Sequence, residues 1–210
     1  MNEEEITRTM ETTTEVTPGK VKELRDKTGA GIMDCKKALA ESGGDLQKAV
    51  DYLRKKGAAT ADKRADRATN QGQVEAYIHA GGRIGSIVEV NCETDFVART
   101  DEFQALVKNL AMHIAAAAPI SVSREEVPSD LLDKERDVFR AQALEEGKPA
   151  AVVDKIVQGR VEKFFSEAVL MDQVYVRDND KKVKDLVGEA ISKLGENIRV
   201  ARFARFQLGQ

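Results

Sequence analysis

The stretch that decides the fold class covers residues 72–91 and reads GQVEAYIHAGGRIGSIVEVN. Apolar and polar residues alternate over 74–79, which is the period of a β-strand. Gly81 and Gly82 follow, and glycine readily adopts the positive φ that a tight hairpin turn requires. The chain then returns over 83–91 as a second strand, so this stretch predicts a β-hairpin.

Helical patterns follow the hairpin. An amphipathic helix that ends at Pro119 carries apolar residues at helical spacing, namely Phe103, Leu106, Val107, Leu110, Ile114 and Ala117. Further helices are expected over 129–146, 150–167 and 183–194, with strands at 174–176 and 198–208. Two strands, long helices, and then strand, helix and strand predict an α+β core with a small antiparallel sheet over 72–210.

Three shorter helices precede the hairpin. Thr17 can cap the first of them, which begins at Pro18, and glycines or a capping Asp45 separate the helices expected over 18–28, 32–41 and 46–56. The second helix carries one apolar stripe made of Ile32, Cys35 and Leu39. Helices this short can enclose only a small core, so a compact three-helix domain is expected over 18–57.

The segments outside these two units are polar. Residues 1–17 hold six Thr and five Glu and predict a disordered acidic lead-in. Residues 58–71 are expected to form a solvated linker or a linker helix, in which basic residues alternate with acids. A nucleic-acid-binding arm over 55–67 is the alternative, but Asp62 and Asp66 interrupt the positive charge and no aromatic residue is available for base stacking.

The composition excludes several classes of protein. The 210 residues include 33 Lys and Arg against 36 Asp and Glu, so the chain lacks the excess positive charge of a general nucleic-acid binder. The sequence contains no apolar run near the roughly 20 residues that cross a bilayer. Two cysteines in a chain of this length do not form a disulfide framework. A cytoplasmic protein without membrane or nucleic-acid partners is expected.

Catalytic and metal-binding motifs are missing from the sequence. His79 and His113 fall in separate elements, and neither Cys35 nor Cys92 has a neighbour at metal-ligand spacing. Residues 81–86 read GGRIGS and lack the GK[ST] ending of a phosphate-binding loop. The sequence therefore predicts no enzyme activity, no cofactor, no metal and no direct binding of a nucleotide.

Two places are unusual for a purely structural protein. Residues 92–99 read CETDFVAR, and Thr94 can cap a short helical turn there that begins at Asp95. Phe96 either folds back onto the core or stays exposed as an aromatic anchor for a partner, and the pattern alone does not decide. Residues 29–37 read GAGIMDCKK, where only one of the two adjacent apolar residues can easily face a small core.

At these motifs the sequence resembles the bacterial elongation factor Ts family. The matching stretches are LRDKTGAGIMDCKKAL at 24–39, EVNCETDFVA at 89–98, AMHIAA at 111–116, GKP at 147–149 and IVQGR at 156–160. The resemblance extends from about Pro18 to the C-terminus. It implies a guanine-nucleotide exchange factor for elongation factor Tu, built from a ubiquitin-associated-type three-helix domain and an α+β core.

The resemblance also implies which residues bind the partner. They are Arg25, Ile32, Met33 and Lys36 of the first domain, Thr94, Asp95, Phe96 and Val97 of the core, and in addition His113 and Ile84. The first set would dock on the GTPase domain. Asp95 and Phe96 would enter that domain near its magnesium and phosphate site, and His113 would lie on the surface facing a second part of the partner.

The length of the chain separates it from the long members of that family. Those members carry the α+β module twice, with a protruding helical hairpin and an extra C-terminal element, whereas this sequence has one set of strands. A homodimer through the sheet is therefore expected, because half a core leaves an open sheet edge. The rival classes are a ubiquitin-binding adaptor, which would explain nothing after Asn70, and a nucleic-acid-binding translation protein, which would use the basic residues over 55–67.

Overall fold

The computed structural model describes residues 16–209, so most of the expected lead-in lies outside the described residues. The N-terminal unit consists of α1 (Pro18–Thr28), α2 (Ile32–Glu41) and α3 (Leu46–Arg64). The Thr17 hydroxyl accepts the Lys20 backbone N–H, and the Asp45 carboxylate accepts that of Lys48, so both expected N-caps are confirmed. The small core of this unit contains Leu24, Cys35, Ala38, Leu39, Ala49 and Val50.

Helix α3 is longer than the sequence predicted. It continues through Gly57 to Arg64, so the expected end before Gly57 is wrong, and the first part of the expected linker is helical. The reason is tertiary, because Gly57 is buried against α8 (Val183–Leu194). A Cβ atom added at Gly57 would stand 3.5 Å from the carbonyl oxygen of Gly188 in α8, so the absence of side chains lets the two helices approach closely. The division into domains at 57 and 58 stays a prediction.

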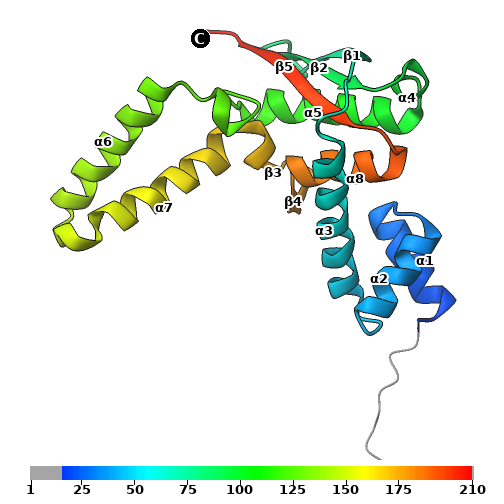
Figure 1. The fold of residues 1–210 in the computed structure, drawn as a ribbon. Helices are drawn as coiled ribbons and strands as arrows, with labels where there is room; N and C mark the ends of the chain where they lie inside the picture. Colours follow the sequence, from blue (N-terminus) through cyan, green and yellow to red (C-terminus); the bar gives the residue numbers. More distant parts are fainter. Residues whose placement is uncertain (1–15, 210) are drawn as a thin grey trace, which may run out of the picture.

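A three-stranded antiparallel sheet lies near the C-terminal end of α3, away from α1 and α2 (Figure 1). It contains β1 (Gln71–Ile78), β2 (Ile84–Cys92) and β5 (Ile198–Gln207) in the order β1-β2-β5. Gly81 and Gly82 both adopt positive φ in the β1–β2 turn, as expected for a hairpin. The pairing of β2 with β5 shifts register after Glu89.

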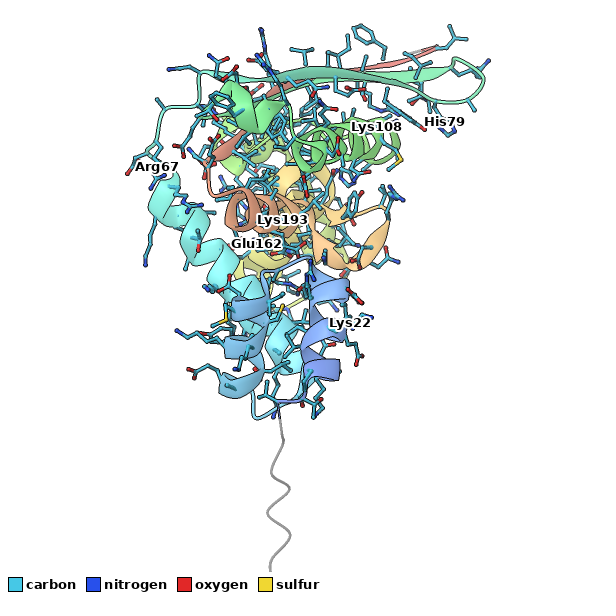
Figure 2. The ribbon with its side chains drawn as sticks, turned by 90° about the vertical axis from the view of Figure 1, so that its right-hand side faces the viewer. Lys22, Arg67, His79, Lys108, Glu162 and Lys193 are labelled. Carbon is cyan, nitrogen blue, oxygen red and sulfur yellow. The ribbon has the colours of Figure 1, made fainter. Side chains whose placement is uncertain are left out.

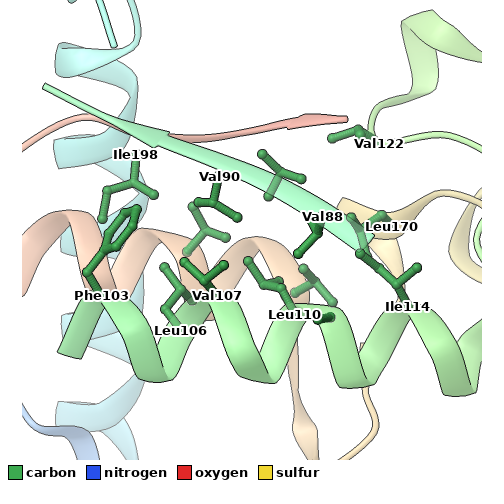
Figure 3. Packing of buried hydrophobic residues seen from close by; sticks show 14 of the residues in the cluster. Val88, Val90, Phe103, Leu106, Val107, Leu110, Ile114, Val122, Leu170 and Ile198 are labelled. Carbon is green, nitrogen blue, oxygen red and sulfur yellow. The ribbon is translucent and has the colours of Figure 1, made fainter. Parts of the chain in front are cut away.

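The main core lies between this sheet and two helices, α5 (Asp101–Ala117) and α8. Figure 3 shows the apolar stripe of α5 against β2, with Phe103, Leu106, Val107, Leu110 and Ile114 on the helix and Val88 and Val90 on the strand. The helices cover one face of the sheet. The apolar residues of β1 point to the other face, where Val74, Ile78, Ile87, Phe206 and Leu208 are exposed.

A helical hairpin projects sideways from the core (Figure 1). Helices α6 (Ser129–Glu145) and α7 (Ala150–Ala168) pack on each other around a separate core made of Val127, Ala143, Val153, Val157, Val161, Phe165 and Val169. Arg124 stabilises the base of the hairpin, because it pairs with Asp172 and Glu162 and lies 4.7 Å from the Phe165 ring centroid. The resemblance attributed a protruding hairpin to the long members of the family, and the structure shows one in this chain too.

The remaining elements are short. The turn α4 (Asp95–Ala98) follows β2, and the 3-10 turns are η1 (Arg124–Glu126) and η2 (Leu170–Asp172). Strand β3 (Val174–Tyr175) pairs with β4 (Asp178–Lys182). The sequence did not predict β4, because the residues DNDKK are all polar and show no alternation. Among residues 16–209 no helix is long and apolar enough to cross a membrane.

The glycine contact between α3 and α8 can be tested by adding side chains. We expect Gly57→Leu to destabilise the protein by about 1–3 kcal/mol, because a larger side chain must force the two helices apart. Gly57→Ala should be nearly neutral or stabilising, because the added Cβ meets ordinary contact distances and alanine favours helix by about 1 kcal/mol. Urea unfolding measures both effects.

Gly159 in α7 provides the matched control. A Cβ atom at this helical glycine meets no atom within 4 Å, so Gly159→Leu should be neutral or stabilising. Equal unfolding midpoints for Gly57→Leu and Gly159→Leu would show that the contact between α3 and α8 tolerates a side chain.

Candidate partner-binding surface

The turn α4 presents an aromatic side chain to solvent. Thr94 caps the turn, and its hydroxyl oxygen accepts the Val97 backbone N–H at 3.4 Å. Val97 packs against the main core, whereas Phe96 is 78% exposed. Asp95 pairs with Arg99 at 2.8 Å on the surface of the same turn. Of the two readings of Phe96, the core reading is wrong, and the side chain is available to a partner.

The carboxylate of Glu196 holds the residues just before this turn. It accepts the backbone N–H groups of Glu93 at 3.1 Å and Thr94 at 3.0 Å, and the Thr94 hydroxyl at 2.6 Å. Three hydrogen bonds to one ionised group fix the entry to the turn, because bonds to a charged acceptor are stronger than those between neutral groups. Sequence reasoning missed Glu196, since it lies more than 100 residues away from its partners.

The neighbouring Asn197 ties the same place to the end of α3. Its backbone N–H donates to the Glu93 carboxylate at 2.6 Å, and its side-chain amide donates to the carbonyl oxygens of Ala65 and Arg67. The hydrogen bond from Asn197 lowers the pKa of Glu93, and the nearby Arg67 guanidinium lowers it further. The entry to α4, the start of β5 and the end of α3 therefore form one polar network.

The two cysteines are buried and do not offer reactive thiolates. Cys92 lies beneath the turn, where its thiol donates to the Thr94 carbonyl oxygen at 3.2 Å and burial raises its pKa to about 11. Cys35 is buried in the three-helix core, which confirms its expected place on the apolar stripe. Within residues 16–209 no group of three or more His, Cys, Asp or Glu side chains could hold a metal ion.

The start of α2 exposes both of its apolar residues. Ile32 is 57% exposed and Met33 is 74% exposed, so the expectation that Ile32 shares the buried stripe of Cys35 and Leu39 is wrong. Helix α2 begins at Ile32, and its first turn projects beyond a core that later residues of the helix already fill. Arg25 and Lys36 are also exposed, and together with Ile32 they line one groove, whereas Met33 is exposed but does not line it.

The two candidate contact areas lie on the same side of the molecule. Figures 1 and 2 place α4 together with α1 and α2 on the side opposite the hairpin of α6 and α7. Helix α3 connects the two areas, since it starts in the three-helix unit and ends near the sheet.

His113 is a structural residue in this chain, so the expectation of a surface position is wrong. The side chain is fully buried, and its Nδ1 accepts the Val176 backbone N–H at 3.3 Å. Its Nε2 therefore carries the proton and donates to the Gln173 side-chain oxygen at 2.9 Å. Burial lowers the pKa of His113, so the imidazole stays neutral at pH 7. Helical periodicity had placed it on a helix but could not show that β3 covers it.

Ile84 does not join the Phe96 surface. It opens β2, whereas the turn α4 follows the other end of this strand, so the two residues lie at opposite ends of the sheet. Ile84 is half-buried and lines a shallow apolar groove of about 480 Å³ on the outer face, together with Ile78, Ile87, Phe206 and Leu208.

Comparisons with known proteins agree with the motifs. The family model described as "Elongation factor TS" matches residues 11–210. The chain is 62% identical to elongation factor Ts of Thermoanaerobacter sp. (strain X514) over 190 residues, which cover 90% of this chain and 93% of the relative. It is 59% identical to the Geobacter sulfurreducens protein of the same name over 195 residues, covering 93% and 90% of the two chains.

Removal of the Glu196 carboxylate tests how the turn is held. We expect Glu196→Ala to lower the free energy of unfolding by about 1–3 kcal/mol, because two backbone N–H groups lose their acceptor. Amide hydrogen exchange at Thr94 should accelerate by at least about tenfold, equivalent to ~1.4 kcal/mol of local protection. Glu41→Ala on the exposed end of α2 is the matched control. Unchanged exchange at Thr94 would mean that Glu196 does not hold the turn.

Proposed function

The chain belongs to the elongation factor Ts family, whose members are nucleotide-exchange factors of elongation factor Tu, and we propose that Phe96 carries this activity here. The observation that supports the proposal is a largely exposed phenylalanine on a turn that the Glu196 carboxylate holds in place. A factor of this kind transforms no substrate. It acts by contact in the cytoplasm, and needs neither a cofactor nor a bound nucleotide of its own.

The mechanism is a thermodynamic linkage. A protein that binds the nucleotide-free partner more tightly than the GDP-bound partner must weaken GDP binding by the same factor. In this proposal Phe96 inserts between helices of the GTPase domain, and Asp95 competes for polar contacts near its magnesium and phosphate site. GDP then leaves faster. GTP, the more abundant nucleotide, rebinds and displaces the factor.

The geometry of α4 suits an anchor of this kind. Large aromatic residues buried in a partner's pocket dominate interface energies, at about 2 kcal/mol or more each. A turn that is already rigid loses little conformational freedom on binding, so less of the contact energy is lost to ordering. Thr94 and Val97 keep the turn rigid, because Thr94 caps it and Val97 packs on the core.

The three-helix unit supplies the second contact in this proposal. Ile32 and Met33 offer exposed apolar surface, and Arg25 and Lys36 add positive charge beside them. This area lies on the same side of the molecule as α4 (Figures 1 and 2). Once the three-helix unit has docked on the GTPase domain, the contact made by Phe96 becomes intramolecular. The effective concentration of Phe96 at its binding pocket is then higher.

The structure gives less support to a nucleic-acid-binding arm over 55–67. Lys56 pairs with Asp34 in the three-helix unit, and Arg67 pairs with Glu93 at 3.4 Å. Arg64 donates to the carbonyl oxygen of Ile191 in α8 at 2.8 Å. Basic side chains that are occupied within the protein are less available to phosphates, so we favour the exchange function.

Truncation of the anchor tests the proposed role. We expect Phe96→Ala to fold normally, because the ring is exposed, and to slow stimulated GDP release from elongation factor Tu by at least about tenfold, or ~1.4 kcal/mol. Stopped-flow release of fluorescent GDP measures the rate. Leu144→Ala removes another exposed apolar side chain, from α6, and should leave the rate unchanged. If Phe96→Ala stimulates release as well as the Leu144 variant, the anchor role is wrong.

We also propose that two copies associate through the outer face of the sheet. This face exposes Val74, Ile78, Ile87, Phe206 and Leu208, and exposed apolar patches of this kind mark association surfaces. The helices cover only the opposite face, so a second copy can bury the outer face by a two-fold symmetric contact. The second copy would then supply the second α+β module that a chain with one module lacks.

The solution mass tests this association. We expect the wild-type chain to show twice the chain mass by light scattering, and Phe206→Asp to shift it toward the monomer, because a buried unpaired carboxylate is strongly unfavourable. Leu144→Asp on the hairpin is the control and should leave the mass unchanged. A monomeric wild-type chain at micromolar concentration would contradict the proposal.

A further inference from the structure

A groove with an apolar floor and a basic rim lies between α1 and α2. Its volume is about 360 Å³, and its apolar lining residues include Val16, Val21 and Ile32. Lys22, Arg25 and Lys36 line its edges, and all three are exposed. Lys22 lies on the outer side of α1 (Figure 2). Among residues 16–209 none of the three basic side chains has an acidic partner within ion-pair distance, so the groove offers uncompensated positive charge.

We propose that the acid-rich segment 3–15 of the same chain binds this groove. The segment contains five acids (Glu3, Glu4, Glu5, Glu11 and Glu15), a single basic residue, Arg8, and two apolar residues, Ile6 and Met10. This pattern is the chemical complement of the groove, since the apolar side chains match the floor and the carboxylates match the basic rim.

The position of the segment in the chain makes this occupant the favoured one. The segment ends at residue 15, and the next residue, Val16, already lines the groove. Ile6 is ten residues from Val16, and ten residues reach at most about 35 Å, which is enough to turn back along a groove between two short helices.

The affinity that this contact needs is modest. A binding segment tethered by a short stretch of chain experiences an effective concentration in the millimolar range, so a dissociation constant of about 1 mM gives half occupancy. A few exposed ion pairs and two partly buried apolar side chains supply an interaction of this order. The charged part of it weakens in salt, because exposed charges are screened.

Occupation of the groove has a consequence that rests on the proposed function. The groove includes Arg25, Ile32 and Lys36, which belong to the surface proposed to dock on the GTPase domain. The segment would therefore compete with the partner for the same side chains. Only a partner that binds more tightly than the tethered segment would displace it, so the segment sets a threshold for weak encounters.

A spin label on the full-length chain tests the contact without any partner protein. Thr7→Cys places one reactive thiol in the segment, and the native Cys35 and Cys92 are fully buried. We expect the label to reduce the amide NMR signals of Val21, Ile32 and Lys36 by at least about twofold, as half occupancy requires. The signals should recover in about 0.5 M salt, where the attraction is screened.

Charge variants separate binding from mere proximity along the chain. Glu3→Gln, Glu4→Gln and Glu5→Gln combined, or Lys22→Glu with Lys36→Glu, should restore the signals, whereas Lys27→Glu with Lys48→Glu changes the same charge outside the groove and should not. Equal signal loss in all variants and in salt would overturn the proposal. A second control mixes spin-labelled chains with unlabelled chains whose amide signals are observed. If the signals are lost only through contact between different chains, the occupant comes from a second copy, which would also overturn the proposal. Neither outcome depends on nucleotide exchange.

Discussion

The close crossing of α3 and α8 at Gly57 and Gly188 fixes how the rest of the molecule is arranged. Two helices without side chains at the contact approach more closely than ordinary helix pairs, so their relative position is tightly limited. Because α3 belongs to the three-helix unit at one end and α8 to the main core, this contact sets where α2 lies relative to α4. Arg64 adds to it by donating to the Ile191 carbonyl oxygen.

The hydrogen bonds around Glu196 fix the position of the turn α4 relative to this framework of helices. A single carboxylate accepts three hydrogen bonds from the residues that enter α4, and Asn197 beside it binds the end of α3. The exposed Phe96 is therefore attached to a framework, although its own contacts with the protein are few. Leaving a phenylalanine in water is unfavourable for the isolated chain, and a rigid support makes the full benefit of burial available to a partner.

Local signals in the sequence predicted the elements whose causes are local. Thr17, Asp45 and Thr94 each cap the helix that they were expected to cap, and the paired glycines form the hairpin turn. Features that depend on distant contacts were missed or mistaken. The length of α3 comes from α8, the burial of His113 from β3, and the support of Thr94 from Glu196. The exposure of Phe96 was likewise undecidable from alternation alone, because a four-residue turn has no periodicity.

The two proposed association surfaces belong to different elements, since the outer face is formed by β1, β2 and β5 and Phe96 lies on the turn α4. The groove beside Ile78 and Phe206 lies at the start of β2, and the apolar face extends along the sheet to Val74, which pairs with Glu89. Phe96 follows the end of β2 on a separate turn. The nine residues of β2 are separated by eight steps of about 3.3 Å, so the two ends of the strand lie about 26 Å apart. In this proposal, association through the outer face does not use the side chain of Phe96. A two-fold symmetric pair would then present two equivalent copies of the exchange surface, one from each chain.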